Sequence, residues 1–224
     1  MLNIELPWNF NSPYKAKNIS DFWKCWHMTL TRFLTKYIYI PLGGNRKGML
    51  RTYVNIMIVY LVSGLWHGAG FTFVVWGILH GMATVLYRMC KKAYDKIPDL
   101  LQWLVTFLFI NVSWVFFRAP SVADALKLIK QVVAGGWHFS INAELAETLL
   151  QPTLISVPSQ FLPIHLVVAG AVLISILGCV FLKNNLERIK TFKPSFPWLI
   201  ATYILLVVGL LSLSGVSTFL YTNF

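Results

Sequence analysis

His67 lies near the middle of an uncharged stretch that is long enough to enter a membrane. Residues 52–87 contain no Asp, Glu, Lys or Arg, and His67 sits there in the segment Leu65-Trp66-His67-Gly68-Ala69-Gly70. A titratable imidazole is costly to keep in such a segment, and it therefore marks a functional site by default. Neutral imidazole also accepts protons near pH 7. We predict that His67 is a general base that takes a proton from a hydroxyl as its oxygen attacks an activated carbonyl.

The attack would also need hydrogen-bond donors for the developing oxyanion. The candidates near His67 are the indole of Trp66, the backbone around Gly68 and the side chain of Asn55, and the sequence does not choose among them. Composition alone leaves a second interpretation of His67 open, in which it is a buried histidine that bridges helices.

The other histidines have weaker claims. His80 is flanked by Gly77 and Gly81, which predicts a packing or hydrogen-bonding residue. His27, taken alone, is typical of a structural residue near the membrane interface. We assign no role to His138 or His165.

Other kinds of chemistry lack the residues that they need. All eight acidic residues lie outside the apolar stretches, so no buried pair of carboxylates is available. There is no GxSxG motif, and residues 43–48 lack the spacing of a phosphate-binding loop. The histidines are not spaced as zinc ligands on a helix, and the three cysteines are far apart. We therefore expect no metal site and no disulfide framework.

The composition predicts a polytopic α-helical membrane protein. The 224 residues are 57% hydrophobic and only 12% charged, about half the charged share of a soluble domain. The formal net charge of +11 does not indicate a nucleic-acid partner, because most basic residues lie in short loops beside apolar segments. Residues 32–51, 88–96 and 183–193 contain 13 of the 19 basic residues, which places these loops on the cytoplasmic side. Met1 to Ser20 does not have the pattern of a signal peptide.

The first predicted element is an amphipathic helix at the membrane interface. Ser20 can cap a helix that begins at Asp21 and ends before Pro41 and the Gly43-Gly44 pair. One face would be apolar and the other basic, which is typical of an interfacial helix. The apolar face would carry Trp23, Trp26, His27, Leu30, Phe33, Leu34 and Tyr37.

The membrane helices are expected to follow. Residues 52–87 would form two short helices that break near residues 68–70, because a break places Arg51 and Arg88 on the same side. Residues 122–133 should form a surface helix. Three further membrane spans are expected at residues 100–117, 163–182 and 198–213. With the two helices of residues 52–87, this makes five membrane-crossing or re-entrant helices.

Two long motifs around His27 and His67 resemble the membrane-bound O-acyltransferase family. The similarity is strongest to the bacterial branch with the alginate O-acetylase and the D-alanine transfer protein of teichoic acids. Shorter similarities follow at residues 116–120 and 219–221. The motifs are Leu6-Pro7 with Asn9-Phe10-Asn11 and Pro13-Tyr14, Asp21-Phe22-Trp23 with Trp26-His27, residues 37–46 (YIYIPLGGNR), and residues 64–69 (GLWHGA).

The resemblance implies an all-α fold, a bundle of tilted and re-entrant membrane helices around a tunnel. It implies that His67 is catalytic and that His27 is the second functional histidine. An acyl thioester, such as acetyl-CoA or an acyl carrier protein, would arrive from the cytoplasmic side without any tightly bound cofactor. The hydroxyl acceptor would arrive from outside. Residues 1–51 would form the interfacial helix and a cytoplasmic loop, and residues 52–224 the membrane helices.

This chain departs from the family pattern in two respects. Position 25 is Cys, where close relatives usually have Arg. Family members are also longer, so residues 1–224 correspond to the carboxy-terminal half. The chain would then be a fragment, a truncated product or one half of a split protein.

The resulting prediction is an O-acyltransferase of the inner membrane that acetylates an exported or cell-surface polysaccharide such as alginate. A periplasmic acetyltransferase would be a further partner. Arg46, Lys47 and Arg51 either attract the anionic donor or only set the topology. The alternatives are D-alanyl transfer to teichoic acid and a non-catalytic scaffold or channel subunit that docks a periplasmic transferase. A transporter is disfavoured, since no acid lies within a span to couple ions.

Overall fold

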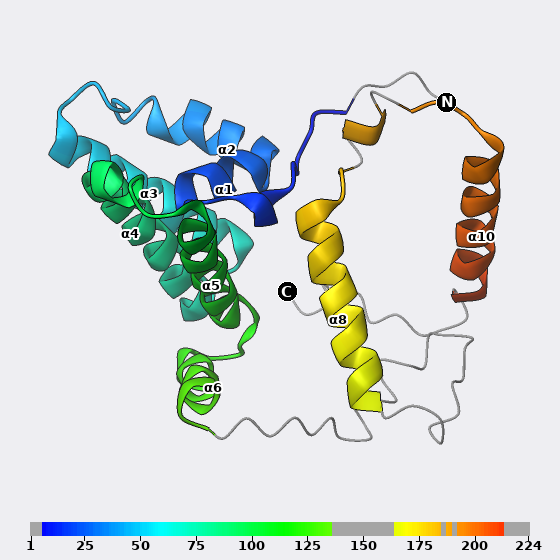
Figure 1. Cartoon of the computed structure of the whole chain (residues 1–224). Coiled ribbons are helices and arrows are strands. Elements are labelled where there is room, and N and C mark those ends of the chain that lie inside the picture. Colours follow the sequence, from blue (N-terminus) through cyan, green and yellow to red (C-terminus); the bar gives the residue numbers. More distant parts are fainter. Residues whose placement is uncertain (1–5, 136–163, 185–186, 190–191, 213–224) are drawn as a thin grey trace. The chain divides into compact units, whose positions relative to one another are not determined.

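The computed structural model describes residues 6–135, 164–184, 187–189 and 192–212 (Figure 1). The chain divides into two compact units, residues 1–136 and 137–224. The second unit contains α8 (Ile164–Phe181) and α10 (Phe196–Ser212). The first unit contains η1 (Pro13–Lys15), α1 (Ile19–Cys25), α2 (Met28–Leu34), η2 (Thr35–Tyr39), α3 (Met49–His67), α4 (Phe71–Tyr94), α5 (Asp99–Arg118) and α6 (Val122–Ala134). Every regular element in the described residues is helical, as predicted.

Three helices are long and apolar enough to cross a membrane: α3, α4 and α5. The parts of α8 and α10 whose side chains are described, Ala169–Phe181 and Phe196–Val207, are apolar but shorter. Of the five predicted spans, the first three are therefore present as full-length helices. Crossing by α8 and α10 stays a prediction.

The predicted break in the long apolar run is confirmed. Residues 68–70 separate α3 from α4, which form an antiparallel hairpin. The two helices are longer than predicted, with 19 and 24 residues. At 1.5 Å per residue they measure about 28 and 36 Å, against a hydrocarbon core of about 30 Å. Arg88 lines the same pocket as Met49 in the first turn of α3, so the start of α3 lies beside the last two turns of α4.

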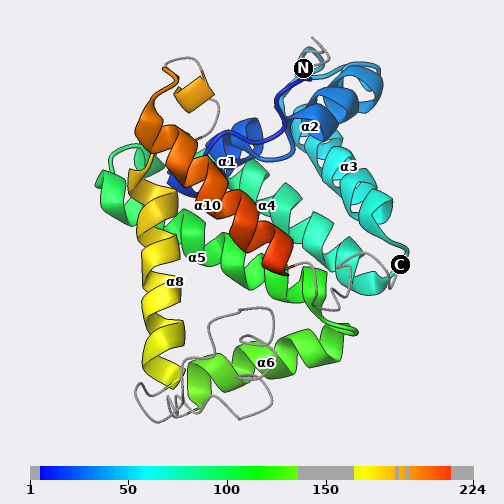
Figure 2. The same ribbon diagram turned by 90° about the vertical axis from the view of Figure 1, so that its right-hand side faces the viewer.

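Glycines allow the close approach of α3 and α4. A Cβ on Gly64 would overlap the carbonyl oxygen of Phe73, and a Cβ on Gly77 would lie 2.5 Å from the carbonyl oxygen of Tyr60. Only a residue without a side chain fits at either position. Helix α4 packs on α3 and also on α5 (Figure 2).

The core of the first unit lies where α1 and α6 meet α4 and α5. It is formed mainly by aromatic side chains and includes Phe22, Trp23, Trp76, Ile110, Phe116 and Ala125. The predicted surface helix is present as α6, and Ser121 caps it by accepting a hydrogen bond from the backbone N–H of Asp124.

The predicted interfacial helix is interrupted, and its predicted cap is wrong. Asn18, not Ser20, accepts the hydrogen bond from the backbone N–H of Asp21, at 2.9 Å. Helix α1 ends at Cys25, and His27 adopts a left-handed backbone (φ 45°) before α2 begins. The interruption is possible because Asn9 accepts hydrogen bonds from the first turn of α2, from the backbone N–H groups of Met28 and Thr29. Helical periodicity cannot reveal such a partner.

The interruption also changes which side chains are buried. Of the residues on the predicted apolar face, Trp23, Leu30 and Leu34 are buried, whereas Phe33 and Tyr37 are more than half exposed. The apolar side chains are thus divided between contacts within the first unit and exposed positions. Their predicted place at a membrane interface stays a prediction.

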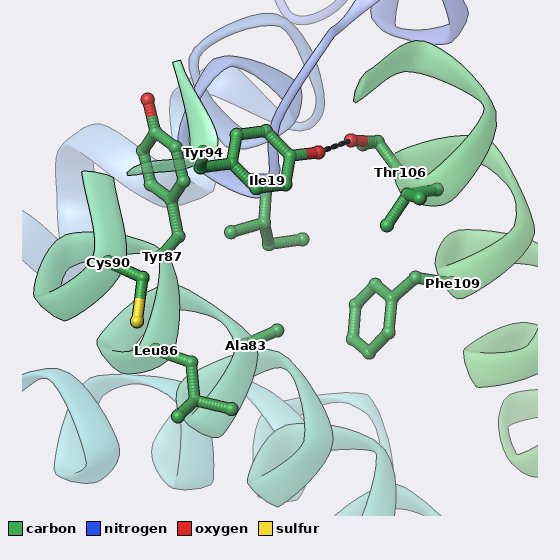
Figure 3. Close-up of a pocket in the computed structure, with 9 residues that line it drawn as sticks. Ile19, Ala83, Leu86, Tyr87, Cys90, Tyr94, Thr106 and Phe109 are labelled. Atoms are coloured by element: carbon green, nitrogen blue, oxygen red, sulfur yellow. Dashed lines mark hydrogen bonds between the residues drawn. The ribbon is translucent and has the colours of Figure 1, made fainter. Parts of the chain in front are cut away.

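An apolar pocket of about 390 Å³ lies between α4 and α5, and Ile19 of α1 also lines it (Figure 3). Tyr94 closes one edge, with its hydroxyl 3.2 Å from Oγ1 of Thr106. His67 does not line it. The predicted tunnel at His67 stays a prediction.

Candidate active site

His67 is the last residue of α3, and its ring lies in a cage of aromatic side chains. The centroid of its ring is 4.8 Å from that of Trp66, 5.3 Å from that of Trp76 and 5.0 Å from that of Phe117. These residues come from the end of α3, from α4 and from α5. His67 is half-buried, so the cage does not seal it off. The ring is therefore partly shielded by aromatic side chains and partly exposed.

The structure brings His27 to the same place. Its ring centroid lies 6.2 Å from that of His67 and 5.6 Å from that of Trp66, although 40 residues separate the two histidines. The left-handed backbone at His27, between α1 and α2, allows this placement. The two histidines of the family motifs therefore share one site.

A hydrogen bond indicates which ring nitrogen of His27 carries the proton. Its Nδ1 lies 3.2 Å from Oδ1 of Asn9, which also accepts from the backbone N–H of Thr29. Because Oδ1 can only accept, Nδ1 of His27 donates and Nε2 is left with a free lone pair. Burial lowers the pKa of His27 below its ordinary value of 6.5, so the neutral ring is favoured at pH 7.

His80 is a fully buried hydrogen-bonding residue, which confirms the interpretation drawn from its glycine neighbours. The indole N–H of Trp23 donates to Nδ1 of His80, at 3.2 Å, and Nε2 lies 3.0 Å from Oγ of Ser113. Since Nδ1 accepts, Nε2 must carry the proton and donate to Ser113, which donates in turn to the carbonyl of Ile110. The chain of bonds joins α1, α4 and α5.

One predicted oxyanion donor is wrong. Asn55 lies 12 residues before His67 on α3, about 18 Å away along the helix. Its Nδ2 donates to the carbonyl of Gly44, at 2.8 Å, and more weakly to that of Leu42. Asn55 therefore holds the 42–44 turn against α3. Trp66 lies beside both histidines and is 59% exposed, so its indole stays a candidate donor.

Two donors next to His67 were not predicted. Oγ of Ser63 and Nε1 of Trp76 are buried and have no hydrogen-bond partner among the described residues. Nothing in the local sequence marks them, because an isolated serine or tryptophan in an apolar helix is unremarkable.

A cavity of about 200 Å³ runs between the α1–η2 segment and the α3–α4 hairpin. Ser63 and Trp23 line it, and so does Arg88. Arg88 also lines a more polar pocket of about 350 Å³ together with Asn45, Gly48, Met49, Thr52 and Tyr53. The two cavities thus share Arg88.

Within the described part of the chain, no cluster of His, Cys, Asp and Glu side chains is arranged to hold a metal ion. The three cysteines are free. His138 and the side chain of His165 lie outside the described residues.

Known proteins are similar to this chain over the segment that contains the site. The family model described as MBOAT, membrane-bound O-acyltransferase family, matches residues 2–123, which include both His27 and His67. The peptidoglycan O-acetyltransferase of Helicobacter pylori is 40% identical over 99% of this chain and 44% of its own length. The chain therefore spans less than half of that relative.

Two other relatives are matched over shorter segments. The probable alginate O-acetylase AlgI of Pseudomonas aeruginosa is 38% identical over 62% of this chain and 27% of its own length. The teichoic acid D-alanyltransferase of Bacillus subtilis is 25% identical over 52% of this chain and 33% of its own length.

Proposed function

The chain belongs to the membrane-bound O-acyltransferase family, and we propose that it supplies the catalytic histidines of an enzyme that acetylates hydroxyl groups of a cell-surface polysaccharide. The observation that carries this proposal is the meeting of His27 and His67, whose ring centroids are 6.2 Å apart in a half-buried aromatic cage.

His67 is the proposed general base. Its ring takes the proton from the acceptor hydroxyl as the hydroxyl oxygen attacks the acyl carbonyl, a role worth roughly 10²–10⁴-fold in rate. Trp76 and Phe117 exclude water from one side of the ring, which limits hydrolysis of the donor. His27 supports this site from the α1–α2 junction, with its free Nε2 available to a substrate hydroxyl.

The proposed donor is an acyl thioester on an anionic carrier, acetyl-CoA or an acyl carrier protein, on the cytoplasmic side. Arg88, shared by the two cavities, supports this route. A negatively charged carrier would rest at the polar pocket near Arg46, Lys47 and Arg51. Its thioester arm would extend along the apolar cavity to Ser63, one helical turn before His67.

The proposed setting is the inner membrane, with the basic loops in the cytoplasm and the acceptor polymer outside. A periplasmic acetyltransferase is a proposed partner that would pass the group on to its final acceptor. The names of the relatives support acetyl over D-alanyl transfer, because the O-acetyltransferases are 38–40% identical to this chain and the D-alanyltransferase is 25% identical.

The substitution His67→Ala tests the proposal at the native locus of the source cell. The amount of base-labile acetate on the exported polymer, divided by the amount of the chain, should fall by about 100-fold or more. His138→Ala, at a histidine with no assigned role, should leave it unchanged. Release of D-alanine in place of acetate would identify the other acyl group.

Two outcomes would contradict the proposal. Undiminished ester in His67→Ala cells with normal chain abundance would exclude the base role. Undiminished ester in the double variant His27→Ala/His67→Ala would instead support a scaffold that docks another transferase.

A further inference from the structure

Two buried hydrogen-bond donors near His67 lack a partner among the described residues. Ser63 is 1% exposed and Trp76 is 2% exposed, yet neither Oγ of Ser63 nor Nε1 of Trp76 makes a hydrogen bond there. A buried polar group that has lost water without gaining a partner destabilises the fold. Such groups are few in native proteins, and each one requires a physical explanation.

The two donors come from facing positions on α3 and α4. The helices touch at their glycines, since a Cβ on Gly64 would lie 3.5 Å from Cα of Gly77. Ser63 and Trp76 immediately precede these two glycines. Ser63 also lies four residues before His67, on the same face of α3. The ring centroid of Trp76 is 5.3 Å from that of His67. Both donors therefore flank the proposed base.

The cavity that runs from Arg88 reaches the same place. Ser63 lines this cavity, and so does Trp23, whose ring centroid is 5.8 Å from that of Trp76. A ligand that enters at Arg88 and extends to Ser63 would end beside the unpartnered hydroxyl and near the aromatic cage. The position of the donors thus fits the reacting end of a ligand.

We propose that the hydroxyl of Ser63 and the indole N–H of Trp76 are catalytic hydrogen-bond donors to the carbonyl oxygen of the acyl thioester. The inference rests on the proposed function and adds to it the groups that stabilise the transition state. They replace Asn55, whose amide is already engaged with the 42–44 turn.

The step balances without any further reactant. The acceptor oxygen forms a bond to the carbonyl carbon, and its proton moves to His67. The carbonyl π electrons move onto oxygen, which accepts hydrogen bonds from Ser63 and Trp76. When the carbonyl re-forms, the carbon–sulfur bond breaks and the leaving sulfur takes the proton from His67. The products are an ester and a free thiol.

Neutral donors suit this position in the protein. They stabilise an oxyanion strongly where water is excluded, and because they are already in place they need no rearrangement during the reaction. Neither Ser63 nor Trp76 competes with His67 for the proton, since neither titrates near pH 7. The cost of leaving both unpaired in the free protein is then repaid when the oxyanion forms.

The experiment combines activity with stability, because an unpartnered donor affects the two in different ways. Ser63→Ala and Trp76→Phe are placed at the native locus. The initial rate of labelled acetate incorporation into the polymer is measured per folded chain. Each substitution should lower this rate about 10²-fold, as the loss of one oxyanion donor does. The melting temperature of the Ser63→Ala chain in detergent should equal that of the parent or exceed it, because no hydrogen bond is lost.

Matched controls lose hydrogen bonds that the structure does contain. Oγ of Ser113 bonds His80 and the carbonyl of Ile110, and Nε1 of Trp103 donates to the carbonyl of Tyr14 at 2.7 Å. Ser113→Ala and Trp103→Phe should therefore lower the melting temperature. Trp103→Phe, which lies outside the cage, should keep the parental rate per folded chain.

A parental rate in Ser63→Ala would overturn the inference. A fall in the melting temperature of Ser63→Ala as large as that of Ser113→Ala would also overturn it. Such a fall would mean that the hydroxyl of Ser63 makes a stabilising hydrogen bond to a structural water. If Trp76→Phe reduces chain abundance, the rate and the melting temperature of Ser63→Ala alone test the inference. His67→Ala is measured in parallel. A parental rate in His67→Ala would refute the proposed function itself. Loss of activity in His67→Ala, with parental rates in Ser63→Ala and Trp76→Phe, would refute only the inference.

Discussion

At the scale of single residues, three histidines in the first unit have three different environments. His67 ends α3 inside an aromatic cage, His27 reaches it from a break between helices, and His80 makes hydrogen bonds through both ring nitrogens. The surroundings of each ring account for the difference. Among the described histidines, His80 has both ring nitrogens in hydrogen bonds with protein groups, which gives it a structural role. The roles proposed for His27 and His67 need a ring nitrogen that can meet a substrate.

The substitution His80→Leu should destabilise the first unit. It leaves the indole N–H of Trp23 buried without an acceptor, at a cost of about 1–3 kcal/mol. The melting temperature of the purified chain in detergent measures the loss. His80→Asn should lose less, because its Oδ1 can replace Nδ1 as the acceptor. Equal melting temperatures for His80→Leu and the parent would show that the bond contributes nothing.

The stability of the chain should depend on pH partly through His27. Burial lowers the pKa of His27 in the folded chain, so between that pKa and 6.5 the unfolded chain binds more protons. The stabilisation is present above about pH 6.5 and is lost as the pH falls towards the folded pKa. Melting temperatures from pH 7.5 to pH 5 should therefore fall more for the parent than for His27→Gln. Parallel curves would contradict this.

At the scale of elements, contacts with segments elsewhere in the chain set the helix boundaries as much as local propensity does. Asn9, distant in sequence, accepts hydrogen bonds at the start of α2, and this allows the helix to break at His27. The α3–α4 hairpin is drawn together at Gly64 and Gly77, and Ser63 and Trp76 immediately precede these glycines on the two facing helices. The site therefore depends on how closely two helices approach.

The substitution Gly64→Ala should disturb the crossing of α3 and α4. Its Cβ would overlap the carbonyl of Phe73, so the helices must separate, at a cost of about 1–3 kcal/mol. Gly170→Ala is the matched control in α8, because nothing lies within 4 Å of its Cβ. Alanine there should leave stability unchanged or raise it by up to about 1 kcal/mol. Thermal unfolding of both variants makes the comparison.

At the scale of the whole molecule, charge and apolar surface predict how the first unit lies in a bilayer. Helices α3, α4 and α5 present large exposed apolar side chains, including Val54, Leu86, Val105 and Leu108. The basic residues near Met49 and Arg88 gather at one end of the α3–α4 hairpin. An apolar surface with a positively charged end favours a cytoplasmic position for that end.

Labelling of single cysteines should reveal this orientation. In a background without the three native cysteines, Lys47→Cys and Lys92→Cys should resist a membrane-impermeant maleimide added to intact spheroplasts. They should react after the cells are opened. Lys127→Cys, on exposed α6 in the predicted outer connection, should react from outside. Reaction of Lys47→Cys in intact spheroplasts would reverse the assigned topology.

The sequence by itself determined the features that depend on neighbours along the chain. The apolar runs predicted α3, α4 and α5, the positions of Arg51 and Arg88 predicted the break near 68–70, and residues 122–133 were predicted as the surface helix that is present as α6. These predictions succeed because a helix makes its backbone hydrogen bonds within its own segment and its apolar pattern can be read from neighbouring residues.

The tertiary structure decided the features that depend on distant partners. It placed His27 beside His67, assigned Asn55 to a turn and left Ser63 and Trp76 without a hydrogen-bond partner among the described residues. Hydrogen-bond partners and packing neighbours 10 to 60 residues away are set only when the helices dock. A site built where helices cross is therefore defined by the packing of the helices.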